Sequence, residues 1–174
     1  MEPRYLSSSL TTAVLTFGMS LIGGIPTAAS EAVFSCESDQ GRLTTVATNK
    51  DLIQQPVFHW GRTQEPTVAN PQQLCNSVSQ KLNNYIAQGN SLSAVTFRAQ
   101  SQMDLPAVCV AESDKPCSLL LFTLAPNPKP DQFANAILTE ILDGDLQTSP
   151  VKSQDRGVQS IAYEVDFWQL LGFR

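Results

Sequence analysis

The sequence NPQQLCNSVSQKLNNYIAQG, residues 70–89, predicts one amphipathic helix in the middle of a chain that otherwise reads mostly as strands. Asn70 is a good N-cap, Pro71 suits the first helical position, and Gly89 is placed to end the helix. A helix with one apolar face needs a sheet to cover. The apolar residues recur at helical spacing on one face: Leu74, Val78, Leu82, Tyr85 and Ile86.

Short extended runs precede this helix. Residues 32–36 and 43–47 are apolar and β-branched, and the turn-like residues 39–41 separate them, which predicts a hairpin. A third run, PVFHW at residues 56–60, has the aromatic and β-branched residues of a strand. It begins with proline, which suits the first position of a strand or a sheet edge.

Extended runs also follow the helix, and a second helix comes after them. Residues 93–99 alternate in part between apolar and polar side chains. Residues 107–111 and 119–124 are continuous apolar runs, so we expect them in the middle of the sheet. Residues 131–143 carry apolar residues at helical spacing. The sequence therefore predicts an α+β fold with a mainly antiparallel sheet of five or six short strands, two amphipathic helices and, from the cysteines, two disulfides.

The start of the chain has the pattern of a cleavable secretory signal. Arg4 precedes an apolar stretch over residues 13–25, and the small residues 27–29 fit the rule for cleavage after Ala29. An uncleaved membrane anchor is the alternative, but this stretch is shorter than the roughly 20 residues that span a bilayer, and glycines interrupt it. We therefore expect residues 1–29 to be a signal peptide and the chain to be exported.

Four cysteines lie after the predicted signal: Cys36, Cys75, Cys109 and Cys117. An even number of cysteines in an exported chain indicates disulfides, and three pairings are possible. Cys109 and Cys117 flank the turn-like ESDKP, so a bridge between them could clip a hairpin; that would leave Cys36 to pair with Cys75. The C-x-x-C spacing of zinc and thioredoxin-like sites is absent from the sequence.

The charge and the motif content argue against several function classes. The chain has 16 acidic and 11 basic residues, and residues 1–29 hold one of each, so the mature chain keeps a net charge of −5. An acidic domain repels phosphate backbones, which argues against nucleic acid as a partner. His59 is the single histidine and lies between two aromatic residues. Because glycine-rich phosphate loops and calcium-loop spacing are missing too, we expect no catalytic residue, no metal and no cofactor.

The C-terminal part changes character along its length. Residues 145–157 are polar and turn-rich, which predicts a mobile linker, whereas residues 158–174 alternate between apolar and polar positions and end in apolar residues. Such a tail is rarely left in water. It either completes the protein's own core, which we favour, or docks on a partner's sheet or a membrane surface. The candidate docking residues are Trp168, Leu170, Leu171 and Phe173.

Six short motifs occur in order within residues 33–140, and they include all four cysteines. They are Phe34-x-Cys36, Thr44-Thr45-Val46-Ala47, Pro56-Val57-x-x-Trp60, Pro71-Gln72-x-x-Cys75-x-x-Val78-Ser79, Pro106-x-Val108-Cys109 and Cys117-x-x-Leu120-Leu121-Phe122-Thr123-Leu124. This set resembles the cyanobacterial circadian oscillating protein family, small exported proteins of unassigned molecular role. Leu74 and residues 67–70 depart from the family pattern, and the tail from residue 145 lies outside the resemblance.

The predicted organisation is a signal peptide at 1–29, a domain like that family at 30–144, a polar linker at 145–157 and an apolar C-terminal element at 158–174. The resemblance implies an exported or membrane-associated protein and implies no reaction. We expect a noncatalytic protein of the periplasm or thylakoid lumen, peripheral to a membrane, that binds an unknown protein partner. The alternative is a small-ligand or peptide-binding module, which needs a concave apolar pocket near Trp60.

Overall fold

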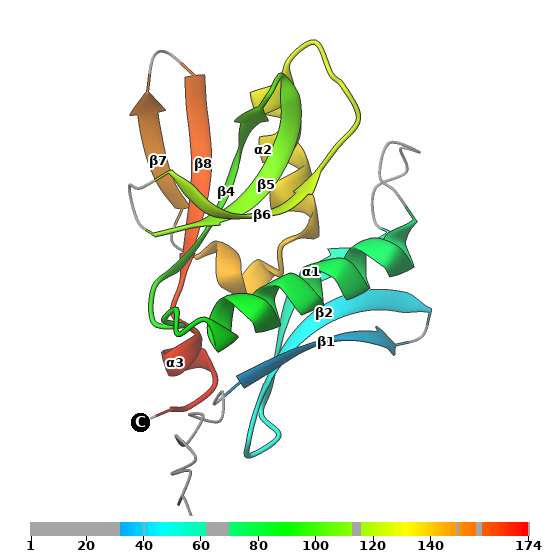
Figure 1. Cartoon of the computed structure of the whole chain (residues 1–174), viewed down its shortest axis with the longest axis vertical. Coiled ribbons are helices and arrows are strands. Elements are labelled where there is room, and N and C mark those ends of the chain that lie inside the picture. The colour runs from blue at the N-terminus through cyan, green and yellow to red at the C-terminus, as the bar shows by residue number, and fades with distance from the viewer. Residues whose placement is uncertain are drawn as a thin grey trace, which may run out of the picture.

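Two antiparallel sheets and two long helices make up the part of the chain that the computed structural model describes (Figure 1). The described residues are 32–39, 41–61, 70–112, 116–148, 150–155 and 158–173. The predicted signal peptide, residues 1–29, and the tip of the ESDKP turn, residues 113–115, lie outside the described residues.

The smaller sheet has the order β1-β2-β3 and is built from β1 (Ala32–Asp39), β2 (Arg42–Asn49) and β3 (Gln54–Trp60). The predicted hairpin is confirmed, because β1 and β2 pair along their whole length. Gly41 lies in the turn between them with a φ of +79°, a backbone conformation that suits glycine. A sheet of only three strands needs a covering layer for stability.

Helix α1 (Pro71–Ala87) supplies that layer and confirms the predicted central helix. The Asn70 side chain accepts a hydrogen bond from the backbone N–H of Gln72, so it caps the helix as expected. The buried face of α1 includes Cys75, Val78, Ser79, Leu82 and Tyr85. This face packs against β1 and β2, and the helix also contacts β6 of the larger sheet.

The larger sheet has the order β6-β5-β4-β8-β7. Its strands are β4 (Val95–Gln102), β5 (Leu105–Ala111), β6 (Cys117–Thr123), β7 (Pro150–Asp155) and β8 (Val158–Val165). The predicted α+β class is confirmed, and the strands are divided between two sheets. The apolar run 119–124 was expected in the middle of a sheet, but β6 is an edge strand. Leu121 and Phe122 are nevertheless buried and Leu119 and Leu120 are half-buried, because α1 lies against this strand.

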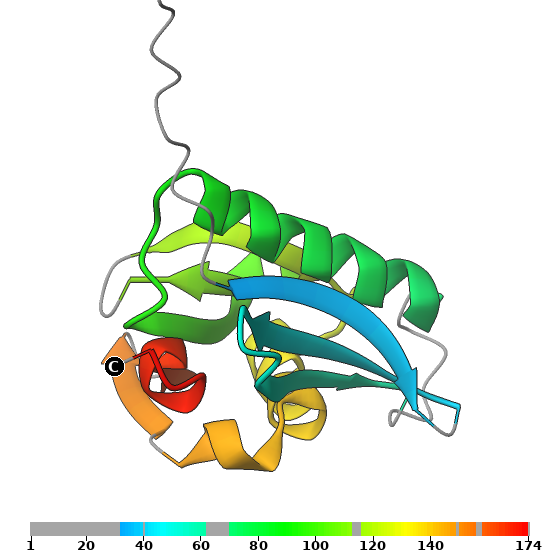
Figure 2. The same ribbon diagram turned by 90° about the horizontal axis from the view of Figure 1, so that it is seen from below.

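The second helix and the tail complete the larger sheet. Helix α2 (Pro130–Ile141) packs on β4, β5 and β8, and Figure 2 shows it on the opposite side of the molecule from α1. Residues 145–157 were predicted to be a linker, but they contain most of the 3-10 helix η1 (Gly144–Gln147) and the strand β7. The linker prediction was wrong because an edge strand can be held by backbone pairing alone, whatever the polarity of its side chains.

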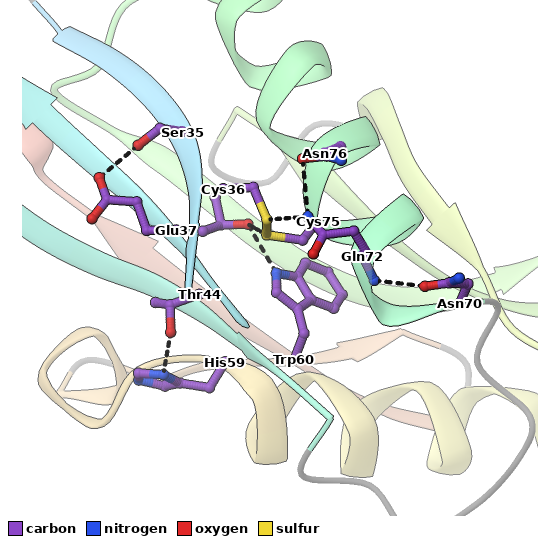
Figure 3. Close-up of a disulfide and its surroundings, with 11 residues drawn as sticks. Ser35, Cys36, Glu37, Thr44, His59, Trp60, Asn70, Gln72, Cys75 and Asn76 are labelled. Atoms are coloured by element: carbon purple, nitrogen blue, oxygen red, sulfur yellow. Dashed lines mark hydrogen bonds between the residues drawn. A yellow bond between two sulfur atoms is a disulfide. The ribbon is translucent and has the colours of Figure 1, made fainter. Parts of the chain in front are cut away.

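Both predicted disulfides are present. Cys109–Cys117 joins neighbouring strands β5 and β6, with 5.7 Å between the Cα atoms. Cys36–Cys75 joins β1 to α1, with 5.5 Å between the Cα atoms, and so fixes the helix to the smaller sheet (Figure 3). The loop that this second bridge closes is long, with a sequence separation of 39, which makes the bridge more stabilising in the chain-entropy account.

Helix α1 also covers a free edge of each sheet. The Asn83 side chain takes the place of a neighbouring strand beside Phe34 in β1: Phe34 N donates to Asn83 Oδ1 at 2.7 Å, and Asn83 Nδ2 donates to Phe34 O at 2.8 Å. Lys81 Nζ donates to the carbonyl oxygen of Leu121 in β6 at 2.6 Å. Unpaired strand edges promote unwanted strand addition, so these contacts protect both edges while joining the two sheets.

The Asn83 contact gives a first prediction. Replacing Asn83 by leucine keeps the size of the side chain but leaves the N–H and C=O of Phe34 without their partners, so we expect a loss of about 2 kcal/mol in the free energy of unfolding. Asn84→Leu is the matched control, because Asn84 is exposed on the next position of the same helix. Urea unfolding measures both variants, and an equal loss in both would contradict the edge-capping role.

Candidate functional site

The C-terminal turn of the chain and the turn between β2 and β3 lie at the same end of the molecule (Figure 1). Together they present large apolar side chains to solvent. Leu52 is 81% exposed and Ile53 45%, while Trp168 and Leu170 are each 38% exposed. We call the group Leu52, Ile53, Trp168, Leu170 and Phe173 the apolar end. Ile53 reaches the C-terminal turn beside Gly172, and exposed apolar side chains gathered at one end of a molecule are typical of interaction sites.

The short helix α3 (Phe167–Leu170) is anchored in the core by its inward side. Phe167 is fully buried, and its ring lies 5.5 Å from that of Phe34 and 6.3 Å from that of Phe97, in edge-to-face geometry. Asp166 caps the helix by accepting a hydrogen bond from Gln169 N at 3.0 Å. The outward side of α3 is therefore held in a fixed position.

The four candidate docking residues of the tail divide between these two sides. Leu171 is fully buried and belongs to the core, whereas Trp168 and Leu170 face solvent in part. Phe173 is half-buried, and its ring centre lies 5.1 Å from that of Trp168. The structure thus places one of the four in the interior and three at the surface.

Asn49, at the end of β2, ties the β2–β3 turn to the C-terminal turn. Its side chain is almost fully buried. Nδ2 donates to the carbonyl oxygen of Leu171 at 2.7 Å, and Oδ1 accepts from the backbone N–H groups of Asp51 and Ile53 at 2.9 and 2.8 Å. One asparagine therefore fixes both halves of the apolar end relative to each other.

Leu52 has an unusual backbone for its residue type. Its φ is +64°, in the left-handed region that glycine, asparagine and aspartate adopt more readily. A leucine there costs about 1–2 kcal/mol relative to a right-handed conformation, and its exposed side chain gives back no core burial. The hydrogen bonds that Asn49 makes with the backbone of residues 51–53 hold Leu52 in this conformation. Sequence reasoning missed Asn49, Leu52 and Ile53, although an asparagine before a turn was a weak signal.

An acidic hollow borders the apolar end. Its volume is about 380 Å³, and it is lined in part by Asp145, Glu164, Asp166 and Leu170. None of its described lining residues is basic. Leu170 belongs to both features, so an apolar surface and a negatively charged one are continuous there.

His59, the single histidine, lies on β3 between the hydroxyl of Thr44 on β2 and the carboxylate of Asp143, which follows α2. Thr44 Oγ1 lies 3.3 Å from His59 Nδ1, and His59 Nε2 lies 2.6 Å from Asp143 Oδ2. The order hydroxyl, imidazole, carboxylate is the one that hydrolases use. Here Asp143 also accepts from Asp145 N and donates its own N–H to the carbonyl of Val57, so these contacts join β3 to the start of η1. The absence of catalysis stays a prediction.

Within the described residues, no group of three histidine, cysteine or carboxylate side chains is arranged to hold a metal ion.

The comparisons with known proteins give the family. The model of the family described as circadian oscillating protein COP23 matches residues 33–171. This chain belongs to that family. The match includes the tail as far as Leu171, so the sequence resemblance, which ended before residue 145, was too short. A search of curated proteins and a search of solved structures each found no match.

The residues that mark this chain as a COP23 family member are structural residues. The motif residues Phe34, Cys36, Cys75 and Cys109 lie in the two disulfides or the core. The disulfides indicate an oxidising, exported environment. Among the described residues, no helix has the length and hydropathy needed to cross a bilayer. The molecular role of the family is unassigned, so membership names no reaction and no ligand.

Asn49 gives the second prediction. Asn49→Ala removes three hydrogen bonds and leaves buried backbone groups unpaired, so we expect a loss of about 2–4 kcal/mol in stability. Hydrogen exchange at residues 51–53 and 167–173 should accelerate together, because the two turns lose their common tie. Asn76→Ala, at an exposed helix position, is the control and should change neither quantity. Faster exchange in only one of the two turns would contradict the coupling.

Proposed function

We propose that this is a noncatalytic exported protein that acts at a membrane surface by binding a protein partner through its apolar end. The proposal is supported by the fixed position of Leu52, Trp168 and their neighbours at the surface. Asn49 bonds the β2–β3 turn to the C-terminal turn, and the fully buried Phe167 anchors the helix that carries Trp168. Preorganised side chains lose little conformational freedom on binding, which favours affinity.

The chemistry of the surface supports a protein partner. Tryptophan is among the residues that most often carry binding energy at protein interfaces. The acidic hollow beside Leu170 suits a lysine or arginine that flanks the apolar residues of a partner segment. A net charge of −5 repels the anionic surface of a lipid membrane, so a peripheral position is better explained by attachment to a membrane protein than by direct contact with lipid.

Export is supported by independent features of the chain. The basic, apolar and small residues of the start fit a cleaved signal, and two disulfides stabilise proteins of oxidising compartments. The periplasm and the thylakoid lumen both fit this proposal.

The intact mass of the protein purified from its native cells tests export. We expect a chain that begins near residue 30, and four cysteines that react with an alkylating reagent only after reduction. A full-length mass with freely reacting thiols would overturn the exported assignment.

Partner binding is tested by a double variant, Leu52→Ser with Trp168→Ser. We expect the variant to lose at least tenfold in recovery of the partner from detergent-solubilised native membranes, because both side chains lose their apolar contact area. Its free energy of unfolding should fall by no more than about 2 kcal/mol, because Leu52 is exposed and Trp168, which contacts Phe173, is only partly covered.

Met103→Ser is the matched control for this experiment. Met103 is 85% exposed and has a φ of +49°, so it is also a large apolar residue at a left-handed turn position, in the β4–β5 turn. Recovery of the same proteins by the double variant and by the wild type would show that the apolar end is not the contact surface.

A further inference from the structure

A second hollow, of about 440 Å³, lies where the β1–β2 turn, the end of β3 and the start of α1 meet. We call it the Trp60 hollow; its described lining includes Arg42, Leu43, His59, Trp60 and Pro71, together with two glycines. The volume is in the range of small-molecule sites and too small for a folded partner. A hollow at this position is what the alternative function, a ligand-binding module, requires.

Two of the side chains that line this hollow, those of Trp60 and His59, are held in place by their contacts. Trp60 is almost fully buried, its Nε1 donates to Thr45 Oγ1 at 2.9 Å, and its ring lies 5.6 Å from that of Phe122. Figure 3 shows Trp60 pointing toward Cys75, while the neighbouring His59 points away from it toward Thr44. Both ring nitrogens of His59 are engaged, so its imidazole is also held in place.

The described lining of the hollow carries a positive charge, opposite in sign to the net charge of the whole protein. Arg42 is exposed at the start of β2, and none of the described lining residues is a carboxylate. Asp143 does not belong to the described lining; its two oxygens accept from His59 and from the backbone of Asp145. The first turn of α1, at Pro71, adds the positive end of a helix dipole to the charge of Arg42.

From this combination we infer that the Trp60 hollow binds a small organic carboxylate with an aromatic or branched apolar body. The body packs against Leu43, Pro71 and the small exposed edge of Trp60, and the carboxylate pairs with Arg42, whose planar guanidinium matches it in two-point geometry. This site is separate from the apolar end, so ligand binding and partner binding can fail independently.

The single histidine of the chain makes a direct test possible. The His59 Cε1–H resonance, unique in the spectrum, is followed by NMR at constant pH and ionic strength while 3-phenylpropionate is added. We expect a saturable shift with a dissociation constant of about 1 mM or tighter. The neutral 3-phenylpropan-1-ol and the cationic 3-phenylpropylamine, which have the same body, should bind at least tenfold more weakly.

Two variants test whether Arg42 provides the positive charge that binds the carboxylate. Arg42→Gln should weaken binding of 3-phenylpropionate by about tenfold, whereas Lys50→Gln, at the opposite end of β2, should leave it unchanged. A Trp168→Phe background leaves Trp60 as the sole tryptophan, so its fluorescence should follow the same binding curve.

Three outcomes would overturn the inference: no saturation up to about 10 mM, equal binding of the amine and the acid, or equal effects of the two charge variants.

Discussion

Helix α1 is fixed to the rest of the molecule at three points, and the arrangement of the two sheets depends on them. The Cys36–Cys75 bridge fixes its first turns to β1. Farther along, Asn83 pairs with the backbone of Phe34, and Lys81 binds the carbonyl of Leu121 on the other sheet. Without this helix the three-stranded sheet would have no cover on its apolar face, and both sheets would expose an open edge. The disulfide and these hydrogen bonds therefore set the position of α1 between the two sheets, where all three pack their apolar side chains.

The same constraint positions the functional surface. Phe34, whose backbone is held by Asn83, packs its ring against Phe167, and Phe167 anchors the short helix that carries Trp168 and Leu170. Asn49 then joins the C-terminal turn to the β2–β3 turn. A continuous set of contacts thus leads from α1 to the apolar end. The hollow at Trp60 lies near the disulfide end of α1, so one helix supports both candidate binding sites.

Local patterns in the sequence were sufficient for the helices, the first hairpin and the disulfides. The N-cap Asn70 and the apolar spacing after it located α1 within one residue at each end. The strand β7 could not be found in this way, because its residues are polar and its pairing with β8 comes from the backbone. Asn49 was out of reach for a related reason, since its bond to Leu171 spans 122 residues of sequence. The apolar end combines distant segments, so only its C-terminal half could be predicted.

The proposed role of the protein requires that the apolar end contacts a partner. Photo-crosslinking in native cells detects such a contact, with p-benzoylphenylalanine placed at Leu52 in one protein and at Met103 in another. Both positions are exposed turn residues with a left-handed backbone, so the two probes differ mainly in location. We expect one defined adduct from position 52 and none from position 103. The same adducts from both positions, or none from position 52, would contradict the proposed contact.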